Sequence, residues 1–170
     1  MIRKLQAFTA FTAVMVTLAA SGCSGSSGSG AAPTPAETVI AATATPTTPS
    51  EYAEATRQIV SDYGVAFRRL GTLMSNPLFD NQTWRQNSFD TFANIQAIGA
   101  RLRALTPPAC LNEVHAAQLE AASSYERTVD LLRGALQSGD DDALQESADS
   151  LGAGNEALSR AVSLLSTARC

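Results

Sequence analysis

The sequence predicts an all-α protein: an antiparallel up-down four-helix bundle that follows a disordered linker. Apolar residues recur with helical period in four separate segments, and no segment shows the alternating pattern of a β-strand. The connections between the four segments are only a few residues long. Short connections place consecutive helices side by side in opposite directions, so we expect residues 49–170 to form one bundle domain with one core.

The first predicted helix begins beside Thr48. The run Thr48-Pro49-Ser50-Glu51 has the pattern of a capping box with proline in the first helical turn. The Asn76-Pro77 pair that follows ends the helix. Its apolar stripe, flanked by further large apolar residues, consists of Tyr52, Ile59, Tyr63, Ala66, Leu70 and Leu73.

The second predicted helix runs from about Asn81 to Leu105. Prolines 107 and 108 break the chain after it, because the residue before a proline is disfavoured in helical conformation. The stripe that we expect this helix to bury consists of Trp84, Phe92, Ile95, Ile98, Leu102 and Leu105.

The third predicted helix opens after Pro108 and ends at Ser138-Gly139, and Asp140 caps the fourth. The third stripe consists of Leu111, Val114, Gln118, Ala122, Tyr125, Val129, Leu132 and Leu136. The fourth stripe, which we also expect to face the core, consists of Leu144, Ala148, Leu151, Asn155, Leu158, Val162 and Leu165.

Small residues repeat every seven positions beside the fourth stripe, at Ser147, Gly154, Ala161 and Ala168. Glycine inside a helix costs roughly 1 kcal/mol relative to alanine, so its presence at 152 and 154 needs a reason. We expect the small residues to let this helix pack closely against a neighbour. A local bend that lines a ligand cavity is the alternative.

Two cysteines of the helical part predict a disulfide. Cys110 lies in the first turn of the third predicted helix, and Cys170 is the last residue. If the hairpin between the third and fourth helices turns at Gly139-Asp140, both cysteines arrive at the same end of an antiparallel pair. An exported chain meets an oxidising compartment, which favours the bridge. The alternative is two free thiols, with Cys170 as a reactive tail.

The first 23 residues carry an export signal. Arg3 and Lys4 precede an apolar, charge-free run, and the small residues Ser21 and Gly22 directly precede Cys23. This segment resembles the signal peptide of bacterial lipoproteins, whose lipobox here reads Ala-Ser-Gly-Cys. The resemblance implies that residues 1–22 are removed and that Cys23 is lipidated on sulfur. The alternative is an ordinary cleaved signal with Cys23 free or paired.

Residues 23–48 form the predicted linker. From Ser24 onward it is nearly all Ser, Gly, Ala, Thr and Pro, with Glu37 as its one charge, a composition that cannot bury enough apolar surface to fold. Loss of Arg3 and Lys4 with the signal changes the formal net charge from −4 to −6. An acidic chain without a basic face argues against nucleic acid as a partner.

The sequence contains no recognisable catalytic or metal-binding constellation. His115 is the only histidine, whereas zinc sites need three or four converging ligands. The run Asp140-Asp141-Asp142 lacks the alternating ligands, central glycine and terminal glutamate of a calcium-binding EF-hand loop, and helix capping explains it better. We therefore expect no enzyme activity, no cofactor and no metal.

Four residues are candidate ligand contacts. His115, Gln118 and Asn155 are polar residues on or beside core stripes, and Trp84 begins an aromatic cluster with Phe79 and Phe89. Of the aromatic residues, Phe89 falls partly off the stripe of its helix and is the best candidate for an exposed contact. Asn155 has an alternative role, since a buried asparagine can fix the register of packed helices.

These observations predict a non-enzymatic lipoprotein of the bacterial cell envelope. We expect it to be held by its N-terminal lipid at the cell membrane or the outer membrane, with the bundle outside the cytoplasm and bound to an envelope protein partner. The alternative is an envelope module that binds a small ligand inside the bundle through His115, Gln118, Asn155 and Trp84.

Overall fold

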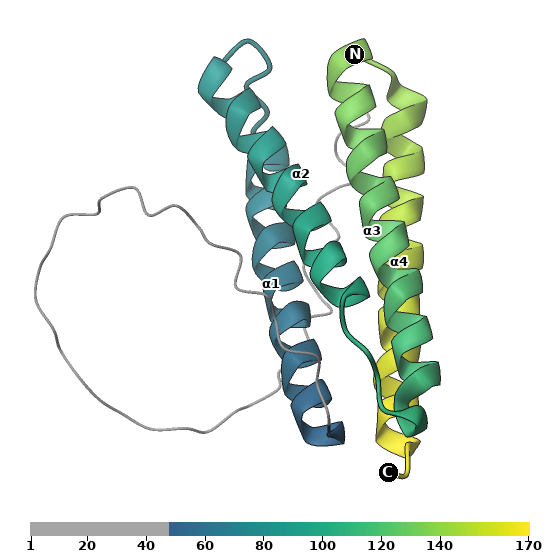
Figure 1. Ribbon diagram of the computed structural model, residues 1–170. Coiled ribbons are helices and arrows are strands. Elements are labelled where there is room, and N and C mark those ends of the chain that lie inside the picture. Colours follow the sequence, from purple (N-terminus) through teal and green to yellow (C-terminus); the bar gives the residue numbers. More distant parts are fainter. Residues whose placement is uncertain (1–47) are drawn as a thin grey trace, which may run out of the picture. The chain divides into compact units, whose positions relative to one another are not determined.

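The computed structural model describes residues 48–170, which form long helices joined by short connections (Figure 1). In chain order the elements are α1 (Pro49–Ser75), α2 (Gln82–Arg103), the 3-10 helix η2 (Ala109–Leu111), α3 (Asn112–Ser138) and α4 (Asp141–Thr167). Each of the four predicted helical segments is present, with ends within a few residues of those expected.

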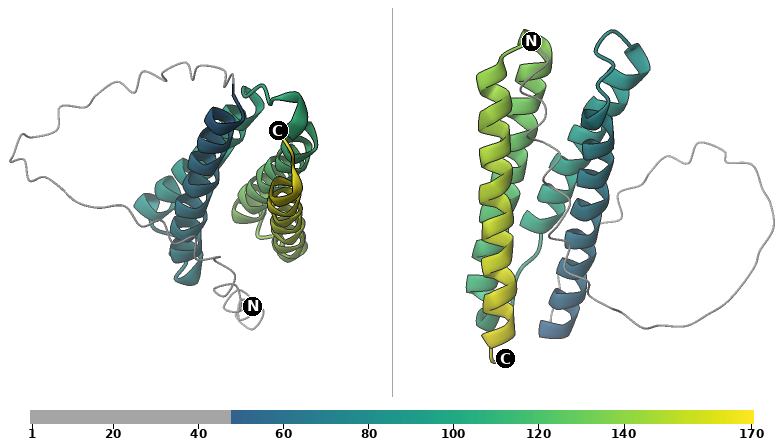
Figure 2. Two further views of the ribbon diagram at one scale, coloured as in Figure 1. Left: turned by 90° about the horizontal axis from the view of Figure 1, so that it is seen from below. Right: turned by 180° about the vertical axis from the view of Figure 1, so that it is seen from behind.

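Consecutive helices run in opposite directions and lie side by side, α1 with α2, α2 with α3, and α3 with α4. The views in Figure 2 show the same order from below and from behind. Residues 48–170 contain no strand. The predicted all-α, antiparallel up-down bundle is therefore confirmed.

The helix ends follow the predicted capping residues. Thr48 Oγ1 accepts a hydrogen bond from Glu51 N at 3.3 Å, and the Glu51 carboxylate accepts one from Thr48 N at 2.9 Å, which completes the capping box. Asp140 Oδ1 accepts from the first backbone N–H groups of α4. Gly139 ends α3 with φ of 73°, in the left-handed region that glycine adopts without a Cβ penalty.

The predicted stripes of the first three helices form the core. All six predicted residues of α2 and its flanks are buried, and so are seven of the eight predicted for α3, Leu136 being half-buried. In α1 only Leu73 of the predicted stripe is half-buried. The aromatic rings of Tyr63 and Phe67 contact Tyr125 of α3, with centroid distances of 5.0 and 4.8 Å.

The prediction for α4 was wrong in its orientation. The face that α4 buries consists of small residues, namely Ser147, Ser150, Gly154, Ala157 and Ala161. The predicted stripe lies beside this face: its leucines 144, 151 and 158 are half-buried, while Val162 and Leu165 are 60% and 40% exposed. The small residues face the core because they let the backbones of α3 and α4 approach closely. This agrees with the expectation that the small residues repeated along this helix allow close packing against a neighbour.

The disulfide between Cys110 and Cys170 is present, with a Cα–Cα distance of 5.5 Å. Cys110 lies in η2, which leads directly into α3, rather than in the first turn of α3 as predicted. The bridge joins the start of the α3–α4 hairpin to its end, across 60 residues of sequence. It holds the C-terminus against the chain that enters α3.

Among the described helices, none is long and apolar enough to cross a membrane. The predicted signal peptide of residues 1–22, the lipidated Cys23 and nearly all of the predicted 23–48 linker lie outside the described residues.

Candidate functional site

A buried polar cluster joins α1 to α3 near the end of the bundle where the disulfide lies. The Tyr52 hydroxyl, on a side chain that is fully buried, donates to Gln118 Oε1 at 2.8 Å and lies 2.8 Å from His115 Nδ1. The rings of Tyr52 and His115 meet edge to face, 5.8 Å apart. The structure thus brings together two of the four candidate ligand contacts, and Tyr52 is the residue that joins them.

Hydrogen bonds join the polar groups of this cluster. With the Tyr52 hydroxyl proton donated to Gln118 Oε1, the contact with His115 Nδ1 is made by the imidazole tautomer that carries its proton on Nδ1. Burial lowers the pKa of His115 from its ordinary value of 6.5 and raises the pKa of Tyr52. A neutral imidazole and a neutral phenol therefore form a structural contact between α1 and α3.

Asn155 lies apart from this cluster. Its Oδ1 accepts from the Tyr125 hydroxyl at 2.9 Å, although the residue as a whole is exposed. Burial raises the pKa of Tyr125 to about 12, so the phenol remains a donor at neutral pH. Asn155 therefore links the outer edge of α4 to an aromatic ring of the core.

The interior between these polar groups is filled. The cavity between the four helices, bordered by Tyr63, Leu102, Gln118, Tyr125 and Leu158, has a volume of about 10 Å³. Binding sites for small organic ligands have volumes of roughly 300–1,000 Å³. Within residues 48–170, the Tyr63 hydroxyl is the buried side-chain polar atom without a hydrogen-bond partner. A space of this size holds at most one water molecule.

A larger depression of about 600 Å³ lies on the outer surface of α3 and α4, bordered by Ser123, Arg127, Asp130, Gly134 and Ala143, among others. It is shallow and open to solvent. Its charged side chains already have partners, since Arg127 pairs with Glu146 and Asp130 with Arg133. It lacks the convergent, unpaired polar groups of a binding site.

Trp84, the fourth candidate, lies at the other end of the bundle. It is 6% exposed, and its indole Nε1 donates to the carbonyl oxygen of Leu73 at 3.0 Å. Its ring packs edge to face with Phe79, 5.3 Å between centroids. The four candidates therefore lie at three separate places and do not form one site. No group of His, Cys, Asp or Glu within the described part of the chain is arranged to hold a metal ion.

The connection between α1 and α2 carries the exposed aromatic residue. Phe79 is 52% exposed and the neighbouring Leu78 is 49% exposed. Phe89, the candidate for an exposed contact, is half-buried and packs against Phe92 with centroids 6.0 Å apart. Leu78 has a sequence signal for exposure, since it follows the helix-ending Pro77 and belongs to neither apolar stripe.

No protein-family model, curated protein sequence or solved structure matches this chain.

Proposed function

We propose that this chain is a non-enzymatic lipoprotein of the bacterial cell envelope whose helical bundle binds a protein partner. In this proposal the lipid on Cys23 holds the chain at the cell membrane or the outer membrane. Residues 24–48 act as a spacer, and the bundle lies outside the cytoplasm. The partner is another envelope protein.

The observation that carries the proposal is the contrast between a filled interior and apolar residues left in solvent. The cavity between the four helices measures about 10 Å³, far too little for a cofactor or organic ligand. Large apolar side chains are instead exposed at the α1–α2 connection and near the C-terminal end of α4. Contiguous exposed apolar residues mark protein-binding surfaces, whereas single ones are common, and Leu78 with Phe79 is the adjacent exposed pair among the described residues. This contrast supports a protein partner over the alternative, a small ligand inside the bundle.

The anchor is supported by the sequence before the bundle and by the disulfide within it. The basic start, apolar run and Ala-Ser-Gly-Cys sequence have the order of a lipoprotein signal. A disulfide persists in an oxidising compartment, which agrees with export. More than one acyl chain on Cys23 would anchor the protein firmly, whereas one chain binds a membrane only marginally.

Fatty-acid labelling tests the anchor. Cells of the source organism that express the full chain are fed a radiolabelled or clickable palmitate, and the chain is compared with the Cys23→Ala variant. We expect label in the unmodified chain and none in the variant. An unmodified chain that takes up no label contradicts the anchor.

The chain offers an unusually clean test for a partner, because Lys4 is its only lysine and lies in the predicted signal. A single lysine introduced at Gln82, Ser61 or Ser159, all exposed, then reports on one face of the bundle. Each variant is expressed in its native envelope and treated with an amine-reactive cross-linker. The unmodified chain measures the background from the N-terminal amine. A discrete adduct with another protein from at least one site supports the proposal, and background alone at all three sites contradicts it.

A further inference from the structure

We infer that Leu78 and Phe79 at the α1–α2 connection form the contact tip of the bundle, and that they dock into an apolar socket of a partner protein bordered by Lys and Arg side chains. This inference rests on the proposed function and assigns it a surface. We call residues Leu78, Phe79 and Asp80 the tip.

Hydrogen bonds hold the tip in one conformation. The backbone N–H of Asn81 donates to the carbonyl oxygen of Leu78 at 2.8 Å, which closes a turn with Phe79 and Asp80 at its centre. The Arg85 guanidinium donates to the carbonyl oxygen of Phe79 at 3.2 Å. Asn81 Oδ1 accepts from Trp84 N at 2.9 Å, which joins the turn to the first turn of α2.

The buried indole of Trp84 packs against the tip and holds it in place. Its indole is fixed by the bond to Leu73 of α1, and the Phe79 ring rests edge to face on it. Half of Phe79 nevertheless remains in solvent, as does half of Leu78. Five ordered contacts, four hydrogen bonds and one ring contact, thus hold the loop in a conformation that exposes two large apolar side chains. Groups ordered before binding lose little entropy when they dock, which is the property of an anchor residue at an interface.

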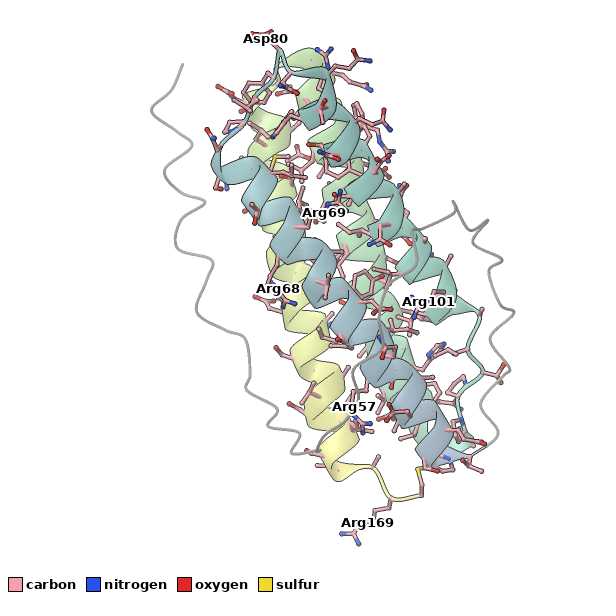
Figure 3. All side chains as sticks on the ribbon, turned by 90° about the vertical axis from the view of Figure 1, so that its left-hand side faces the viewer. Arg57, Arg68, Arg69, Asp80, Arg101 and Arg169 are labelled. Atoms are coloured by element: carbon pink, nitrogen blue, oxygen red, sulfur yellow. A yellow bond between two sulfur atoms is a disulfide. The ribbon has the colours of Figure 1, made fainter. Side chains whose placement is uncertain are left out.

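Charge identifies the kind of partner. Asp80 is exposed at the end of the bundle opposite Arg169, as Figure 3 shows. The α3–α4 connection lies at this same end, and Asp141 and Asp142 follow it in the first turn of α4. None of these three aspartates forms an ion pair within residues 48–170. Arg85 is the basic residue that contacts the tip, through the carbonyl oxygen of Phe79. A socket rimmed by Lys or Arg is the electrostatic complement of the three aspartates.

The same charges favour a protein over a lipid surface. Anionic headgroups attract basic segments and repel acidic ones, so an apolar pair beside unpaired aspartates is poorly suited to membrane insertion. The chain also enters the bundle at Thr48, at the opposite end of α1. The 27 residues of α1 separate that entry from the tip by about 40 Å. The tip is thus the part of the bundle that a tether at Thr48 leaves free.

Site-specific photo-cross-linking in the native envelope tests the inference. Benzoylphenylalanine, which keeps an apolar aromatic ring, is placed at position 79 of the full chain and reacts with C–H bonds of protein or lipid alike. The matched control places it at position 65 on the outer face of α1, because Val65 is 54% exposed and has no comparable support. Emission of Trp84, the chain's only tryptophan, verifies that the tip is intact.

We expect a protein adduct from position 79 and none from position 65. In the position-79 background, Leu78→Ser and Asp80→Lys should each reduce the adduct at least about tenfold. A lipid adduct at 79 would overturn the inference in favour of membrane contact, and an adduct insensitive to Asp80→Lys would overturn the basic socket. If position 79 gives no adduct while the single lysines at Ser61 or Ser159 do, the tip is excluded and the proposed function stands.

Discussion

Gly154 of α4 lies directly against the ring of Tyr125 on α3. A Cβ atom at position 154 would come within 2.5 Å of Tyr125 Cε1 and 2.6 Å of Cδ1. Gly152, two residues earlier, has nothing within 4 Å of the corresponding position. Two glycines of one helix therefore have different reasons for their presence, and only the one at 154 is required by packing.

This difference predicts opposite effects of the same substitution. Gly152→Ala should stabilise the bundle by about 0.5–1 kcal/mol, because alanine favours helix and meets no atom. Gly154→Ala should destabilise it by about 1–2 kcal/mol, because overpacking against Tyr125 outweighs the gain in helix propensity. Urea unfolding followed by circular dichroism measures both. Equal stabilisation by the two variants would show that α3 and α4 are not in close contact at Gly154.

The buried hydroxyls of Tyr52 and Tyr63 give a second matched pair. Tyr52→Phe should destabilise the bundle by about 1–3 kcal/mol, because it removes the partner of the buried Gln118 Oε1 and of Nδ1 of the half-buried His115. Tyr63→Phe should be neutral or slightly stabilising, since its hydroxyl has no partner among the described residues. Free energies of unfolding from chemical denaturation decide this. A loss at Tyr63 as large as that at Tyr52 would mean that the Tyr63 hydroxyl is bonded in solution.

The lowered pKa of His115 predicts a pH dependence of stability. As the pH falls below 6.5, His115 becomes protonated in the unfolded chain but stays neutral in the folded chain, because its pKa is lower in the folded state. Unfolding is therefore favoured as the pH falls through 6.5, and the contribution of His115 is fully present only above that value. His115→Gln should flatten the stability profile between about pH 7.5 and 5.5.

Proton NMR supplies the direct measurement, because the chain has one histidine and hence one imidazole signal to follow. The titration midpoint should lie below 6.5 in the folded protein and return to about 6.5 in concentrated urea. A folded midpoint at or above 6.5 would contradict the burial argument.

The disulfide should contribute a large part of the stability. On the loop-entropy account, a bridge that closes 60 residues stabilises a domain by about 4 kcal/mol. Replacing both Cys110 and Cys170 with serine should lower the free energy of unfolding by about 2–4 kcal/mol. Intact mass after alkylation, with and without reductant, verifies the bridge first. Alkylation of either cysteine in the unreduced protein would show that the bridge is incomplete.

Most of the helical architecture was predictable because it depends on local rules. Thr48 with Glu51, Asn76 with Pro77, and Gly139 with Asp140 mark helix ends through backbone hydrogen bonding and allowed dihedral angles. The stripes of α1, α2 and α3 are rich in large apolar residues on a single face, so the period alone identifies the buried side.

The orientation of α4 and the position of the candidate site required the folded chain. Leucines at 144, 151 and 158 formed the more apolar stripe, yet α3 presents Tyr125 and Ser124 close to the backbone of α4. Only small side chains fit that separation, so Gly154 and its neighbours face inward. Likewise, nothing local indicates that Tyr52 meets His115 across 63 residues of sequence, or that Phe79 rather than Phe89 remains in solvent.

The sequence by itself thus determined four antiparallel helices, their caps and the pairing of Cys110 with Cys170. Periodicity and capping act over short stretches of chain, and the meeting of the two cysteines follows from the lengths of the two helices between them. The tertiary structure decided which face of α4 is buried, which polar groups meet inside, and that two apolar residues stand on a braced turn at one end. Those outcomes depend on how closely two helix backbones approach and on which side chains fill the space between them, and neither quantity is written in any one segment of the chain.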